Sequence, residues 1–213
     1  MKNSRRFFPA ARAGFTLVEL LAVILIIGIL MGFLLPKIPE AIDQARITGC
    51  KKNMTEIYSG FTMYESKFGK PPQQSGVRFF AELIALGVWE DTKTSTKKLN
   101  CPAAQQPIGT QGMPEAEWYV DLAPIDGTWS SYAGRDCKGH PLKKLQSGKE
   151  PLVSDDNDGE LNHRTTTVVL YGDGSPQTFE SKLLFQEGQL GKDELLIVGP
   201  GSQIPDLEKL SLD

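Results

Sequence analysis

One uninterrupted apolar run constrains this chain more than any other feature. From Phe15 to Leu35 there are 21 residues, and Glu19 is the only charged one among them. Because a helix rises about 1.5 Å per residue, about 20 apolar residues cross a hydrocarbon core of roughly 30 Å. The run therefore predicts a transmembrane helix. A carboxylate inside such a helix costs on the order of 3 kcal/mol unless it finds a partner.

The charges before the run predict its orientation. Residues 1–14 carry four basic side chains and no acidic one: Lys2, Arg5, Arg6 and Arg12. Basic flanks stay on the cytoplasmic side, so we expect a cytoplasmic N-terminus and an extracytoplasmic remainder. An ordinary secretory signal is the alternative. It needs a shorter apolar core and a small-residue cleavage site, and nothing after Leu35 provides one.

The segment Gly14-Phe15-Thr16-Leu17-Val18-Glu19, with the apolar run and Pro36 behind it, resembles type IV prepilins and the G-like pseudopilins of type II secretion. The resemblance implies that prepilin peptidase cuts between Gly14 and Phe15 and that the new Phe15 amine is N-methylated. It also implies that Pro36 loosens the helix where these families commonly carry a proline. A plain single-pass anchor that happens to contain a glutamate is the alternative interpretation.

Glu19 has a physical role in that family reading. In the processed chain its carboxylate lies one helical turn from the Phe15 ammonium group, near the partial positive charge of the helix N-terminus. In a bundle of such helices, Glu19 of one subunit neutralises the Phe15 amine of its neighbour, and both charges are paired in a low dielectric. The resemblance thus implies a homo-oligomeric helical filament that contacts prepilin peptidase, an inner-membrane assembly platform and other pilins or pseudopilins.

Composition excludes several function classes. The chain has 23 basic and 26 acidic residues, and removal of residues 1–14 leaves 19 basic residues and a net charge of −7. Such an acidic balance argues against nucleic-acid binding, which needs clustered Lys and Arg. There is no Gly-x-Ser-x-Gly elbow, phosphate loop or His-Glu-x-x-His. We therefore expect a protein that is not an enzyme.

A second helical stretch follows the apolar run. Seven residues recur at spacings of three and four and form one apolar stripe: Ile47, Cys50, Met54, Ile57, Phe61, Tyr64 and Phe68. Gly69-Lys70-Pro71-Pro72 predicts the end of this helix, because glycine permits left-handed backbone and proline cannot continue a helix. The stripe could pair in a coiled coil, but the more favoured partner is a sheet formed by the residues that follow.

The remaining residues predict one loop-rich domain, large enough for its own core. We expect a short helix at 78–86 and strands at 117–122, 165–171, 177–179 and 195–198, with a hairpin turn at 172–175 and an irregular or weakly helical tail. The predicted fold class is α+β, a long N-terminal helix on a small antiparallel sheet, as in pilins. Its parts are a basic leader (1–14), a transmembrane and filament-core helix (15–35), an amphipathic continuation (36–68) and an extracytoplasmic domain (69–213).

A histidine motif adds a narrower resemblance. His163 is followed after nine residues by Asp173-Gly174, which is similar to a His-x9-Asp-Gly signature of one group of prepilin-like proteins. The family often has glycines after the histidine, whereas this chain has Arg164 and three threonines there. His163 is either a metal ligand or part of a site with Asp173, or it is a histidine that hydrogen-bonds the facing turn at the start of a hairpin.

An acidic segment is a candidate calcium site. Asp155, Asp156 and Asp158 cluster before Gly159, and calcium takes six to eight oxygen ligands. The spacing does not fit a helix-loop-helix calcium motif, since Thr165 stands where a bidentate glutamate is expected. A different calcium loop stays open because major pseudopilins that resemble this chain bind calcium in a C-terminal loop. The alternative is a polar turn.

The chain has three cysteines, Cys50, Cys101 and Cys137. An extracytoplasmic domain can hold a disulfide, and a Cys101–Cys137 pair is the expected one. Cys50 lies on the apolar stripe and is more simply a small core residue.

Together these features predict a structural subunit of a type IV pilus-like filament or type II secretion pseudopilus. It would be anchored in the bacterial inner membrane and would form a periplasmic or surface filament after assembly. A membrane-anchored minor pilin that acts at a tip in binding, adhesion or DNA uptake is the alternative.

Overall fold

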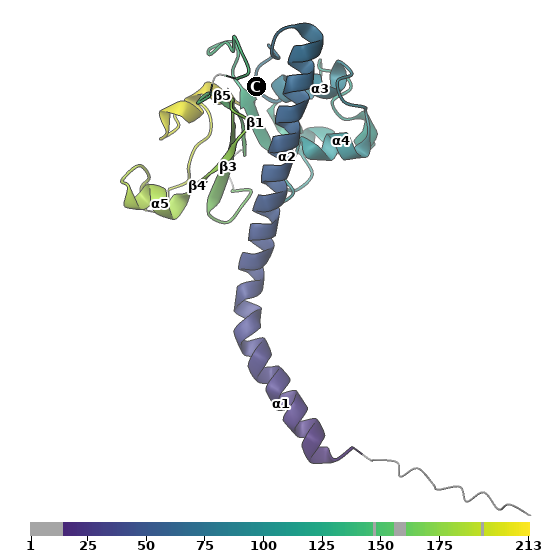
Figure 1. The fold of residues 1–213 in the computed structure, drawn as a ribbon, viewed down its shortest axis with the longest axis vertical. Helices are drawn as coiled ribbons and strands as arrows, with labels where there is room; N and C mark the ends of the chain where they lie inside the picture. The colour runs from purple at the N-terminus through teal and green to yellow at the C-terminus, as the bar shows by residue number, and fades with distance from the viewer. Residues whose placement is uncertain (1–14, 147, 156–160, 193) are drawn as a thin grey trace, which may run out of the picture. The chain divides into compact units, whose positions relative to one another are not determined.

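The computed structural model describes residues 15–146, 148–155, 161–192 and 194–213, and the chain divides into two compact units, one ending at Ala41 and the other beginning at Ile42. The first unit contains α1 (Leu17–Leu34), η1 (Leu35–Lys37) and the first residues of α2 (Ile38–Phe68) (Figure 1). Pro36 occupies the first turn of the 3-10 helix η1, so the helical geometry changes at the proline that the sequence singled out.

The rest of α2 is the longest helix of the second unit and contributes to its main hydrophobic cluster. Its buried residues follow the predicted stripe from Ile47 to Tyr64 and add two polar or small positions: Asp43, Ile47, Cys50, Met54, Ile57, Gly60, Phe61 and Tyr64. Phe68, the last residue of the predicted stripe, is exposed at the end of the helix. The helix ends at Phe68, and Gly69 then takes the left-handed backbone (φ +74°) that the sequence predicted there. The stripe packs on a sheet, as expected, and not in a coiled coil.

The sheet has five strands, β1 (Tyr132–Arg135), β2 (Pro151–Asp155), β3 (Thr166–Tyr171), β4 (Pro176–Glu180) and β5 (Leu210–Ser211). Their order is β4-β3-β2-β1-β5, and every neighbouring pair is antiparallel. The β3–β4 hairpin is confirmed, with Val168 opposite Thr178 and the turn at residues 172–175. The α+β class with a long helix on a small antiparallel sheet is therefore confirmed.

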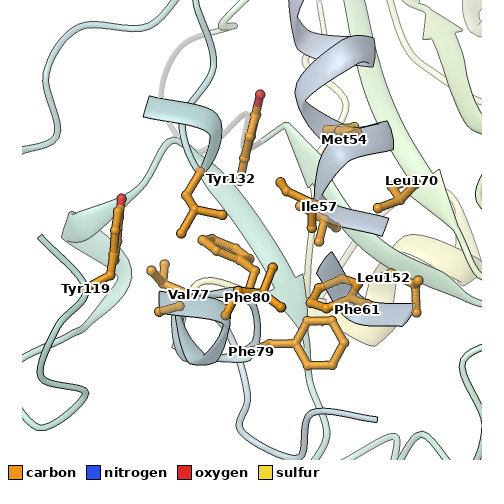
Figure 2. Close-up of a cluster of buried hydrophobic side chains, with 14 of the residues drawn as sticks. Met54, Ile57, Phe61, Val77, Phe79, Phe80, Tyr119, Tyr132, Leu152 and Leu170 are labelled. Atoms are coloured by element: carbon orange, nitrogen blue, oxygen red, sulfur yellow. The ribbon is translucent and has the colours of Figure 1, made fainter. Parts of the chain in front are cut away.

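Both faces of the sheet are covered, and β3 shows this most clearly. Val168 and Leu170 face one hydrophobic cluster with α2 and α3 (Val77–Ala85), as Figure 2 shows around Leu170. Val169 and Tyr171 belong to a second cluster with α5 (Ser181–Gln186) and the C-terminal segment. In Figure 1, α2 and α3 lie on one side of the sheet and α5 on the other. A strand buried on both faces has a continuous apolar run, which is the pattern of residues 168–171 in β3.

The main cluster joins α2 to α3. The ring centroids of Phe61 and Phe79 lie 4.8 Å apart, and both side chains are fully buried (Figure 2). The helix predicted at 78–86 is confirmed as α3. Shorter elements complete the domain: α4 (Lys93–Lys98), η2 (Ile108–Thr110), η3 (Glu115–Glu117), η4 (Gly127–Trp129) and η5 (Pro205–Lys209).

Two predicted strands are wrong. Residues 117–122 form no strand, because Tyr119 adopts a left-handed conformation (φ +62°) and buries its ring beside Trp118 and Trp129. Residues 195–198 are irregular, although Leu196 and Val198 are buried in the second cluster. Strands β1 and β2 were not predicted, and the C-terminal tail contains η5 and the two-residue strand β5.

Candidate functional site

The start of α1 is organised by a reciprocal cap. The backbone N–H and the hydroxyl of Thr16 both donate to Oε2 of Glu19, each at 2.9 Å, and the backbone N–H of Glu19 donates to the Thr16 hydroxyl at 3.2 Å. This is the capping-box arrangement, which satisfies backbone donors at a helix N-terminus. The Thr-x-x-Glu spacing was the sequence signal for it. Glu19 thus has a local partner besides the expected Phe15 amine.

The rest of α1 presents apolar side chains without a partner in the first unit. None of its 18 residues is buried, and Phe33, for example, is 78% exposed. The continuous helical stretch Leu17–Phe68 is long and apolar enough near its N-terminus to cross a membrane. A helix that is apolar on all sides requires lipid or other apolar helices around it. Phe15 lies just ahead of this helix and is exposed, whereas Gly14 lies outside the described residues.

A second group of chemically active side chains lies inside the second unit. Cys50 on α2, Cys101 after α4, Asp155 at the end of β2 and His163 before β3 are all buried, and one ligand-type atom from each lies within 4.8 Å of the others. Sγ of Cys50 lies 3.3 Å from Oδ1 of Asp155, and Sγ of Cys101 lies 3.4 Å from Nε2 of His163. The same Nε2 lies 3.3 Å from Oδ2 of Asp155. We call these four residues the Cys-Asp-His cluster.

The cluster shifts the protonation of its own members. Burial opposes the charged imidazole, but Asp155 and Cys101 outweigh it and raise the pKa of His163 to about 10. The neighbouring Cys50, with help from His163, lowers the pKa of Cys101 to about 7. Burial raises the pKa of Cys50 well above that of an ordinary thiol. The surroundings therefore favour the protonated form of the His163 imidazole and the ionised form of the Cys101 thiol.

Of the three candidate calcium residues, Asp155 is the one that the structure describes. The side chain of Asp155 is fully buried and faces sulfur and nitrogen atoms, and its Oδ2 also accepts the backbone N–H of Val168 at 3.3 Å. Calcium is bound by oxygen ligands, so this position does not fit it. Asp156 and Asp158 lie outside the described residues.

The motif residues His163, Asp173 and Gly174 do not form one site. His163 precedes β3 and Asp173-Gly174 follow it, so they lie at opposite ends of the strand. Oδ1 of Asp173 accepts the backbone N–H of Ser175 at 2.8 Å within the hairpin turn. The expectation that His163 hydrogen-bonds the facing turn is wrong, because its polar contacts are with Asp43, Cys101 and Asp155.

The expected Cys101–Cys137 disulfide is absent from the structure, in which all three cysteines are free. Cys101 faces Cys50 and His163, whereas the Sγ of Cys137 lies 3.8 Å from the carbonyl oxygen of Pro72. Cys50 is a buried core residue, as expected, and it also belongs to the Cys-Asp-His cluster. Sequence reasoning missed this second role because its partners come from segments about 50 to 110 residues further along the chain.

Comparisons with known proteins concern the N-terminal part. Residues 9–35 match the family model described as the prokaryotic N-terminal methylation motif. A stretch of 67 residues is 34% identical to the type II secretion system core protein G of Pseudomonas aeruginosa; it covers 31% of this chain and 47% of that protein. The chain thus spans about half the length of this curated relative. No solved structure matches the present chain.

These similarities support a protein of the type IV pilin or pseudopilin kind. Such proteins are structural subunits and not enzymes. The methylation motif covers the Gly14–Phe15 junction, Glu19 and the apolar run.

Proposed function

We propose that this chain is a structural subunit of a type IV pilus-like filament or type II secretion pseudopilus, cut after Gly14, methylated at Phe15 and assembled through its N-terminal helix. The observation that carries the proposal is α1. This helix lies within the methylation motif, begins with a capping box that contains Glu19, and has 18 residues of which none is buried. A soluble domain has no use for such a helix, because exposed apolar surface is unfavourable by about 25 cal/mol per Å².

Two environments can cover this helix in turn. A single copy buries it in the lipid bilayer, and an assembled copy buries it among the same helices of neighbouring subunits. The four basic residues of the leader support a cytoplasmic N-terminus, with the domain from residue 69 on the other side of the membrane. Processing and assembly of this kind require three kinds of partner: prepilin peptidase, an assembly platform, and related pilins or pseudopilins.

Glu19 is the residue that couples processing to assembly in this proposal. Its carboxylate is held at the helix N-terminus by Thr16, in the region where cleavage creates the Phe15 ammonium group. In the filament, that carboxylate faces the ammonium group of a neighbouring copy. Removal of one partner of a buried ion pair costs about 3–5 kcal/mol, because the other charge stays buried and unpaired.

The test is filament yield from cells that carry Glu19→Ala, with membrane levels of the protein matched to wild type. We expect at least about a tenfold loss of filaments, since 1.4 kcal/mol already changes an association constant tenfold. The matched control is Glu40→Ala. Glu40 is exposed and pairs with Lys37 at 3.3 Å, outside the apolar run. It should leave the yield unchanged. Equal yields from both variants would contradict the role of Glu19.

A further inference from the structure

Four potential metal ligands converge in the interior of the second unit, and nothing in the proposed assembly role uses them. The Cys-Asp-His cluster draws its members from α2, the segment after α4, the end of β2 and the residues before β3. None of the four residues is more than 4% exposed. We propose that this cluster is a structural zinc site, in which two cysteines, one histidine and one aspartate hold the ion tetrahedrally.

The distances between ligand atoms fit such a site. Zinc bonds of about 2.3 Å to sulfur and 2.0–2.2 Å to nitrogen or oxygen place neighbouring tetrahedral ligands about 3.3–3.8 Å apart. The structure has Oδ2 of Asp155 at 3.4 Å from Cys50 Sγ and at 3.3 Å from His163 Nε2. Cys101 Sγ lies 3.4 Å from His163 Nε2. Three edges of the tetrahedron are therefore already at the required length.

The donor set selects the kind of ion. Two thiolates and an imidazole favour zinc, whereas calcium and magnesium take oxygen ligands. All four protein positions are filled, as in structural zinc sites, and no open position remains for a substrate. On binding, each thiol that is still protonated and the protonated Nε2 of His163 release their protons to solvent. The sulfur and nitrogen lone pairs are then donated to Zn²⁺, with no change in oxidation state.

Three of the four ligands have an outer hydrogen-bond partner, and the fourth, His163, faces a carboxylate; outer partners are the usual arrangement around a bound metal. Nδ1 of His163 has no hydrogen-bond partner among the described residues, and the nearby Oδ1 of Asp43 lies 3.7 Å away. With the proton on Nδ1 facing this carboxylate, the lone pair of Nε2 points into the cluster. The other outer contacts are Tyr132 Oη on Cys50, the N–H of Ala103 on Cys101 and the N–H of Val168 on Asp155.

The consequence is a cross-link between parts of the chain that lie far apart in sequence. Zinc would tie α2 to the loop after α4 and to the adjacent strands β2 and β3 at one point of the core. A Cys50–Cys101 disulfide is the competing use of the two sulfur atoms in an oxidising compartment, and the two alternatives exclude each other.

The test uses the full chain purified in detergent micelles, reduced, loaded with Zn²⁺ and freed of excess metal. Elemental mass spectrometry should find about one zinc per chain, the stoichiometry of a single four-ligand site. Cys101→Ser and His163→Gln should each lose at least about tenfold in zinc affinity. Cys137→Ser is the matched control, because this buried cysteine lies outside the cluster, and it should retain wild-type zinc.

A second measurement does not depend on variants that fold. Wild-type protein loaded with Co²⁺ should show the visible bands of a tetrahedral site and thiolate-to-cobalt charge transfer. X-ray absorption of the zinc form should give two sulfur neighbours at about 2.3 Å. No zinc uptake by wild type, an octahedral cobalt spectrum, calcium binding in place of zinc, or a Cys50–Cys101 disulfide in protein taken from cells would each overturn the proposal.

Discussion

Glu82 on α3 is a buried side chain whose carboxyl oxygens are not all hydrogen-bonded within the described residues. Only 5% of the residue is exposed, and its Oε2 has no hydrogen-bond partner among the described residues. Burial raises the pKa of Glu82, and the nearby Tyr64 hydroxyl offsets this only in part. The folded chain therefore holds this proton more tightly than the unfolded chain, whose glutamates titrate near pH 4.3. Stability from this group is complete below that pH and is lost as the pH rises through the folded-state pKa.

Glu82→Gln imitates the protonated acid and removes this pH dependence. We expect the variant to be more stable than wild type at pH 7 by on the order of 1 kcal/mol, the scale of an unsatisfied buried polar group. Near pH 4 the difference should vanish. Thermal unfolding of the purified chain at both pH values measures it. Glu90→Gln, an exposed carboxylate soon after α3, is the control and should change neither melt. A less stable Glu82→Gln protein at pH 7 would count against this account.

The sequence singled out three residues that lie in the Cys-Asp-His cluster, but it paired each of them with a residue outside the cluster. Asp155, His163 and Cys101 were each singled out, with Asp156, Asp173 and Cys137 as their respective expected neighbours. The structure instead brings the first three together with Cys50. A cluster of neighbouring carboxylates, a motif resemblance and the expectation of a disulfide suggested these pairs. The antiparallel pairing of β2 with β3 and the packing of α2 on the sheet bring other residues together.

At the scale of elements, the β3–β4 turn explains the Asp-Gly half of the His-x9-Asp-Gly motif. Gly174 has φ +83°, and a Cβ there would lie 2.7 Å from Cε1 of Tyr58. The Tyr58 hydroxyl donates to the carbonyl oxygen of Gly172 at 3.1 Å, so α2 and the turn are in direct contact. The glycine is thus required both for its backbone and for the space that the tyrosine fills.

Gly174→Ala should therefore be more damaging than an alanine in an otherwise similar backbone. Gly188 also has positive φ (+72°) but has open space where a Cβ would stand. We expect Gly188→Ala to cost about 1–2 kcal/mol from left-handed strain. Gly174→Ala should cost about 1–3 kcal/mol more from overpacking against Tyr58. Chemical denaturation of the two variants measures the difference, and equal losses would show that the Tyr58 contact has no energetic weight.

Long and strongly patterned elements were predictable, and short ones were not. α2, α3 and the β3–β4 hairpin follow from apolar spacing, glycine and β-branched residues. β1 has only four residues, including Gly134, and all are buried, so it shows no alternation. Residues 117–122 look like a strand by composition, but the left-handed Tyr119 uses its aromatic ring for core packing instead.

The chain consists of two units whose surfaces suit different surroundings, one apolar and one aqueous. The first unit exposes almost only apolar side chains along α1, whereas the second encloses a core on both faces of its sheet. The composition of the apolar run was sufficient to predict the helix of the first unit, because a helix surrounded by lipid needs apolar side chains but no specific contacts. The interior of the second unit depends on contacts between distant segments, which no local pattern encodes. The proposed zinc site belongs to that interior.

The central claim is that the chain loses its basic leader and keeps its apolar helix. N-terminal mass spectrometry of the protein from membranes, with and without the host's prepilin peptidase, tests this most directly. We predict a mature terminus at methylated Phe15 when the peptidase is present and retention of residues 1–14 when it is absent. A leader that persists in the presence of the peptidase, or a cut beyond Leu35 that discards the helix, would contradict the account.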